Sequence, residues 1–123
     1  MDSHDLGAFG ERKAAEYLFA CGFQILAQNL YYREGEIDIL AEKEGHLFAI
    51  EVKTRRSQRF GAVVESMTAQ KIKRIQRAVR RWRQESKDSR DLSLCFIGIE
   101  VTASGQLNLD YLHLDDLDLL SGY

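Results

Sequence analysis

The stretch GEIDILAEKEGHLFAIEVKT, residues 35–54, decides the fold because it contains two apolar runs joined by a short charged turn. Ile, Leu, Val and Phe on both sides of a turn near Glu44-Gly45-His46 predict a β-hairpin. Charged residues stand inside both runs, namely Glu36, Asp38, Glu51 and Lys53. A charge within a half-buried strand is costly unless it is paired or bound to a metal. The hairpin therefore carries the first indication of a functional site.

Strand alternation predicts which of these side chains meet. Residues two apart on a strand point the same way, so Glu51 and Lys53 share a face, with Cα atoms about 6.6 Å apart. On the partner strand Glu36, Asp38 and Leu40 are expected on one face, and Ile37 and Ile39 on the other. If the apolar sets pair, Asp38 lies near Glu51 and Lys53.

Two carboxylates and a lysine on one face suit a particular chemistry. Clustered carboxylates repel one another, which raises a pKa or attracts a cation. Oxygen ligands favour Mg²⁺ or Mn²⁺, and a nearby ammonium stabilises the charge that a phosphodiester gains in its transition state. The alternative is structural: Glu51 and Lys53 form an ion pair and Asp38 is solvated. The paired aspartate, a helix carrying Glu11 and a basic block downstream favour the metal site.

The rest of the chain is expected to surround this hairpin as one domain, residues 1–123 with a core at about 6–114. We expect a helix over 6–21 ended by Gly22, a strand over 23–29, and a polar loop, RRSQRFG, after Thr54. A second helix should be capped by Thr68 and bury Ile72, Ile75, Val79 and Trp82, so that Trp82 belongs to the core. Strands are expected over 92–101 and 107–112. The order α-β-β-β-α-β-β predicts an α/β fold with a mixed sheet flanked by helices.

Charge is distributed unevenly along the chain, although its net value is only −2. Residues 1–52 contain 4 Lys/Arg and 10 Asp/Glu, residues 53–90 contain 13 and 3, and residues 91–123 contain 0 and 6. The basic middle third is a candidate contact surface for phosphate backbones, and its alternative is a solvated helix face. The candidate nucleic-acid contacts are Arg55, Arg56, Arg59, Lys71, Lys73, Arg74, Arg77, Arg80 and Arg81.

Composition limits the compartment and the redox chemistry. No apolar run approaches the roughly 18 residues of a membrane span, and the start of the chain lacks the apolar core of a signal peptide. Cys21 and Cys95 are far apart in apolar contexts, so both are expected to be buried thiols, with a disulfide as the less favoured alternative. These features predict a cytoplasmic protein with no membrane partner.

Asp38 followed by Glu51-Val52-Lys53 resembles the D…(D/E)-x-K core of the restriction-endonuclease-like, PD-(D/E)xK, nuclease superfamily. Over about residues 7–83 the chain also resembles the YraN-like bacterial family, an uncharacterised family whose fold is similar to archaeal Holliday-junction resolvases. The segments that carry this resemblance are GERKAAEYL, GFQILAQNL, GEIDILAE, FAIEVKTR and FGAVVESMTAQKIKRI.

The resemblance implies a role for each matching residue. Asp38 and Glu51 would be metal ligands, Glu11 would reach in from the first helix, and Lys53 would be the catalytic lysine. Glu36 and Gln70 would lie beside this group. A homodimer is expected only by analogy with the resolvases.

The chain departs from the family pattern in two places. Ile37 replaces the superfamily's proline, and LSLCFIGIEV lacks the Arg-Phe-Asp-like segment of the fourth strand. The second departure puts the predicted activity in question more than the predicted fold.

The expected function is Mg²⁺- or Mn²⁺-dependent endonucleolytic hydrolysis of DNA, with branched or flapped DNA as the candidate substrate. A catalytically inactive nucleic-acid-binding or assembly protein that retains the fold is the alternative. A third hypothesis is a structural domain whose basic helix binds an acidic protein.

Overall fold

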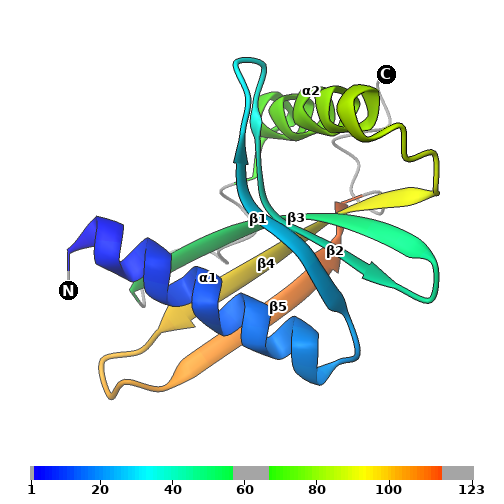
Figure 1. Ribbon diagram of the computed structural model, residues 1–123. Helices are drawn as coiled ribbons and strands as arrows, with labels where there is room; N and C mark the ends of the chain where they lie inside the picture. Colours follow the sequence, from blue (N-terminus) through cyan, green and yellow to red (C-terminus); the bar gives the residue numbers. More distant parts are fainter. Residues whose placement is uncertain (1, 57–66, 115–123) are drawn as a thin grey trace.

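The computed structural model of the chain describes residues 2–56 and 67–114. It contains two helices and five strands in the order α1-β1-β2-β3-α2-β4-β5 (Figure 1), which confirms the predicted order. The elements are α1 Ser3–Ala20, β1 Gln24–Tyr31, β2 Glu36–Lys43, β3 His46–Arg56, α2 Ala69–Ser86, β4 Leu92–Val101 and β5 Leu107–His113. Neither helix combines the length and the apolar character that a membrane-crossing segment needs.

All five strands form one mixed sheet in the order β1-β2-β3-β4-β5. Strands β3 and β4 are parallel, and every other neighbouring pair is antiparallel. The chain crosses from β3 to β4 through α2, as a parallel connection requires. The β2–β3 turn lies at Glu44 and Gly45, both with positive φ, and confirms the predicted hairpin.

Helix α2 begins at its predicted cap, whereas α1 begins at Ser3, before the expected Leu6. The Asp2 side chain accepts a hydrogen bond from the Asp5 amide at 2.8 Å, and the Thr68 hydroxyl accepts one from the Lys71 amide at 3.2 Å. Such side-chain acceptors satisfy amides that the first turn of a helix leaves exposed. After α1, Gly22 adopts a φ of +92°, so the predicted stop is confirmed.

A helix covers each side of the sheet (Figure 1). The α1-side cluster includes Leu18, Ile39, Ile50 and Ile97. The α2-side cluster includes the predicted stripe, and Trp82 packs against it as a partly buried side chain. Burial of these apolar faces holds both helices against the sheet.

Close backbone approach positions the helices relative to the hairpin. A Cβ at Gly10 would lie 1.6 Å from the Thr54 hydroxyl oxygen, so α1 rests directly on β3. A Cβ at Gly35 would lie 1.9 Å from the Arg74 carbonyl oxygen, and Figure 1 shows the joined ends of β1 and β2 beside α2. Both positions exclude a larger residue unless the backbone moves.

Three sequence-based expectations are wrong in detail. Strict alternation places Ile37 with Ile39, but Ile37 packs on the α2 side and Ile39 on the α1 side. The polar loop begins later than expected, because β3 continues to Arg56 beside β4. Cys21 is an exposed free thiol, whereas Cys95 is buried as predicted. Cys21 directly follows α1 as its C-cap residue, which explains its exposure.

Candidate active site

Asp38 lies where β2 and β3 begin to separate. The described pairing of these strands runs from Lys43↔His46 to Ile39↔Ile50, one residue short of Asp38. The Val52 amide donates a hydrogen bond to Asp38 Oδ2 at 2.8 Å, which replaces a missing strand-to-strand bond. Asp38 is 8% exposed and is the buried charged side chain of the described residues. A carboxylate is therefore fixed inside the protein at this point.

Glu51 shares this location with Asp38. Its carboxyl hydrogen-bonds to the Asp38 carboxylate, and burial followed by the Asp38 charge raises the pKa of Glu51 to about 8. Burial also raises the pKa of Asp38, while the Val52 amide opposes that rise. A buried carboxyl in contact with a partly buried one retains a proton unless a cation replaces it. The pair has the electrostatic properties of a cation site.

Glu11 reaches this pair from α1. Burial and the Asp38 charge raise the pKa of Glu11, and a side-chain hydrogen bond to Asn29 lowers it. Glu36, at the start of β2, adds a further negative charge felt by Glu11, Asp38 and Glu51. The predicted residues are therefore electrostatically coupled across three elements.

The predicted metal ligands are not gathered at coordination spacing. Within 2–56 and 67–114, the group of three with all ligand atoms less than 4.8 Å apart is Asp2, His4 and Asp5, an exposed group at the start of α1. Glu11 therefore stands further from the Asp38–Glu51 pair than a ligand bound to the same ion would.

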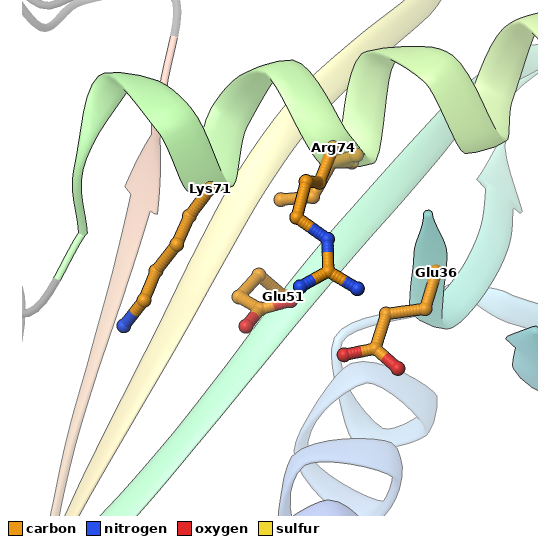
Figure 2. A pocket seen from close by; sticks show the side chains of 5 residues that line it. Glu36, Glu51, Lys71 and Arg74 are labelled. Carbon is orange, nitrogen blue, oxygen red and sulfur yellow. The ribbon is translucent and has the colours of Figure 1, made fainter. Parts of the chain in front are cut away.

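A cleft of about 100 Å³ opens between Glu51 and α2. It is lined by Glu36, Glu51, Lys71, Arg74 and Ile75. In Figure 2 the Lys71 and Arg74 side chains extend from α2 toward the strands, and the Arg74 guanidinium lies between the Glu51 and Glu36 side chains. Carboxylates on the strands thus face cations on the helix across one cleft.

Lys53 lies two residues beyond Glu51 on β3. The β3–β4 register is continuous from Leu47↔Leu92 to Arg56↔Val101, so regular alternation places Lys53 on the same face as Glu51. Its side chain is exposed and forms no ion pair within the part of the chain that the structure describes. Lys53 does not line the cleft beside Glu51.

The candidate nucleic-acid contacts on α2 are exposed, and two of them, Lys71 and Arg74, also line the cleft. Lys71, Lys73, Arg74, Arg77, Arg80, Arg81 and Gln70 are all exposed. Arg81 is engaged with Glu34 at 3.8 Å and Glu85 at 3.2 Å. On β3, Arg55 is partly buried and Arg56 exposed, while Arg59 lies outside the described residues.

Asn29 and Tyr31 also belong to this site, and the sequence-based prediction missed them. Asn29 has a φ of +53°, and its side chain bonds to Glu11 and, at 3.3 Å, to the Tyr31 hydroxyl. Asparagine is enriched at positive φ, but nothing local marks this position as a turn. Asn29 gains Glu11 as a hydrogen-bond partner only because α1 packs close to β1.

Comparison with known proteins identifies the family. The family model described as Uncharacterised protein family UPF0102 matches residues 10–102. The chain belongs to this family. The matched range contains Glu11, Asp38, Glu51, Lys53 and the whole of α2.

Relatives in several bacteria carry the UPF0102 name. The chain is 47% identical over 75 residues to a UPF0102 protein of Symbiobacterium thermophilum, covering 61% of this chain and 64% of the relative. It is 43% identical over 76 residues to a UPF0102 protein of Syntrophomonas wolfei, and this match covers 62% of this chain and 66% of the relative. It is 38% identical over 87 residues to a UPF0102 protein of Caldicellulosiruptor saccharolyticus, and this match covers 71% of this chain and 74% of the relative. The first two matches span just under two thirds of each relative.

Proposed function

We propose that this UPF0102 protein is a divalent-metal-dependent endonuclease of the restriction-endonuclease-like type that hydrolyses DNA phosphodiester bonds. The observation that carries the proposal is the hydrogen-bonded Asp38–Glu51 pair, which is buried at a strand separation beside a cleft with two cations. The D…E-x-K sequence pattern and the exposed basic face of α2 support it independently.

The residues present fit a divalent cation. Asp38 and Glu51 offer only oxygen atoms, which Mg²⁺ and Mn²⁺ prefer. Their raised pKa values mean that the protein alone does not stabilise two negative charges there. A bound ion would polarise the phosphoryl oxygen and lower the pKa of a water molecule. Asp38 and Glu51 would hold it, and the Glu11 side chain would have to move closer from α1 to complete the set.

The other side chains have separate tasks in this proposal. Lys71 and Arg74 bind the phosphate at the cleft, because they face the carboxylates from the opposite wall. Lys53 stabilises the charge on the reacting phosphate or orients the attacking water, since its ammonium is exposed on the Glu51 face. The outward cations of α2 and Arg55 and Arg56 contact the DNA backbone, which positions DNA without reading its sequence.

One observation favours the alternative of a nucleic-acid-binding or assembly protein without hydrolytic activity. The ligand atoms of Glu11, Asp38 and Glu51 do not all lie within 4.8 Å of one another, because Glu11 stands apart from the other two. Such a protein would bind DNA through the same basic helix but would cleave none of the substrates.

A cleavage panel tests the proposal directly. Single-stranded, duplex, flapped and four-way-junction DNA would be incubated with the protein and Mg²⁺, Mn²⁺ or EDTA. We expect metal-dependent products with the wild type and none with Asp38→Asn. Products that persist in EDTA or in Asp38→Asn would contradict the proposed site. Tight binding of every substrate without products under any metal would favour the alternative.

A further inference from the structure

A second cleft is lined by Glu11, the carboxyl that is also coupled to the Asp38 charge. It has a volume of about 350 Å³, and its lining includes Gly7, Ala8, Glu11, Asn29 and Tyr31. This volume falls in the roughly 300–1,000 Å³ range of small-molecule sites. Gly7 and Ala8 present almost no side chain, and a Cβ added at Gly7 would meet nothing within 4 Å. The α1 wall of the cleft is therefore open.

Tyr31 forms an aromatic wall of this cleft at the end of β1. The residue is 69% exposed. Its hydroxyl donates a hydrogen bond to Asn29 Oδ1 at 3.3 Å, so the ring is restrained although it is exposed. A restrained, exposed ring is suited to stacking, because little side-chain entropy remains to be lost.

Asn29 connects this ring to the candidate active site. Its side chain bonds both the Tyr31 hydroxyl and the Glu11 carboxyl. Asn29 has a φ of +53°, a left-handed conformation that asparagine tolerates better than most residues. The bonds give a continuous path from Tyr31 through Asn29 to Glu11.

The side chains that line this cleft differ in charge from those that line the cleft beneath α2. Lys71 and Arg74 line the α2 cleft, whereas the described lining of the second cleft contains neither lysine nor arginine. His4 also lines the second cleft, but its side chain is 93% exposed and lies 3.9 Å from the Asp5 carboxylate, so a phosphate group would meet neither lysine nor arginine there. Glu11 and Asn29 instead offer carbonyl and carboxylate oxygens, which accept hydrogen bonds from the amino groups of nucleobases.

We propose that this cleft receives one unstacked nucleotide of DNA, whose base stacks on Tyr31 while its phosphate lies toward the Asp38–Glu51 pair. The inference rests on the proposed function and defines its substrate class. A base inside a continuous duplex has no free face, so only a single-stranded or flapped segment presents such a base. Tyr31 would thus give the protein a preference for DNA with displaced nucleotides.

Binding measurements with matched variants test this inference. Fluorescence anisotropy would compare a dye-labelled 15-nucleotide single strand, a duplex of the same length and a flapped duplex. Ca²⁺ would replace Mg²⁺ to keep the strands intact. Tyr31→Ala should weaken single-strand and flap binding by roughly 5- to 150-fold, the range that corresponds to one lost base stack of about 1–3 kcal/mol. Duplex affinity should stay within about twofold, and Tyr31→Phe should retain most of the single-strand affinity.

Phe19→Ala is the matched control, because Phe19 is 76% exposed on α1 and does not line the cleft. It should leave all three affinities unchanged. In a second measurement, a single strand carrying one 5-iodouracil should photocrosslink to Tyr31, as located by mass spectrometry.

The outcomes separate the inference from the proposed function. The inference would be overturned if Tyr31→Ala lost affinity for all three DNAs equally, or for none of them. If duplex binding were still salt-dependent, the nuclease proposal would stand. A wild type that binds none of the three DNAs would overturn both.

Discussion

The Glu51 carboxyl hydrogen-bonds to the Asp38 carboxylate across two neighbouring strands, β3 and β2. Neither group can be ionised without increasing repulsion on the other, and Asp38 is largely shielded from water. Protons and cations therefore compete for the same position. This competition leads to predictions on stability, metal binding and DNA binding.

Stability should fall as pH rises through the neutral range in metal-free buffer. The pKa of Glu51 rises from 4.5 to about 8 on folding, so the native state holds the proton more tightly than the unfolded state. The contribution is complete below about pH 4.5 and is lost as pH rises toward 8. Its slope is at most about 1.4 kcal/mol per pH unit. Urea unfolding at pH 5, 6.5 and 8 would measure it.

Glu51→Gln should flatten this pH dependence, because the amide does not titrate. Glu16→Gln serves as the control, since the Glu16 side chain is 65% exposed and faces solvent on α1. An unchanged slope in Glu51→Gln would show that another group causes the pH dependence.

Mg²⁺ or Mn²⁺ should raise the melting temperature of the wild type by mass action, because the ion binds the native state. Asp38→Asn should abolish this rise and leave the metal-free protein folded, or stabilise it by removing repulsion. Asp5→Asn alters the competing Asp2-His4-Asp5 group and should preserve the rise. Loss of the rise in Asp5→Asn alone would place the ion at the start of α1. Differential scanning fluorimetry across a metal titration makes the comparison.

Duplex DNA binding should weaken steeply with salt. About five phosphate contacts would give a slope of log K against log salt of roughly −4 to −5. Replacing both Arg74 and Arg77 with alanine should flatten the slope by up to about two, for all sequences alike. Arg81→Ala should change it less, because Arg81 already contacts Glu34 and Glu85. Binding without salt dependence would identify α2 as a solvated face or a protein contact.

Lys53→Ala should abolish cleavage while changing DNA affinity little. The proposed task of the lysine lies at the transition state, where charge on the phosphate is greatest. Single-turnover cleavage and anisotropy on the same protein would separate the two effects. A variant that loses affinity and rate in equal proportion would instead place Lys53 among the backbone contacts.

Two glycines of α1 should respond in opposite directions to alanine. Gly10→Ala brings a Cβ to 1.6 Å from the Thr54 hydroxyl oxygen, and overpacking of this kind costs about 1–3 kcal/mol. Gly7→Ala meets nothing within 4 Å and should gain roughly 0.5–1 kcal/mol from better helix propensity. Urea midpoints measure both. Equal effects would mean that α1 does not rest on β3 as closely as the structure shows.

The sequence by itself determined the elements and much of the candidate site. The hairpin, the α2 stripe and the helix ends follow from side-chain periodicity, capping and glycine, all of which act within a few residues. Asp38 and Glu51 were predictable as neighbours because pairing two apolar strands leaves few registers.

Only the tertiary structure decided how the site is completed. The β2–β3 pairing ends next to Asp38, so alternation fails there and Ile37 and Ile39 pack in opposite clusters. Asn29 acquires Glu11 as a partner because α1 lies on the sheet. Lys71 and Arg74 face the carboxylates because α2 crosses beside Gly35. These relationships depend on twist and close approach between distant segments, which local periodicity does not encode.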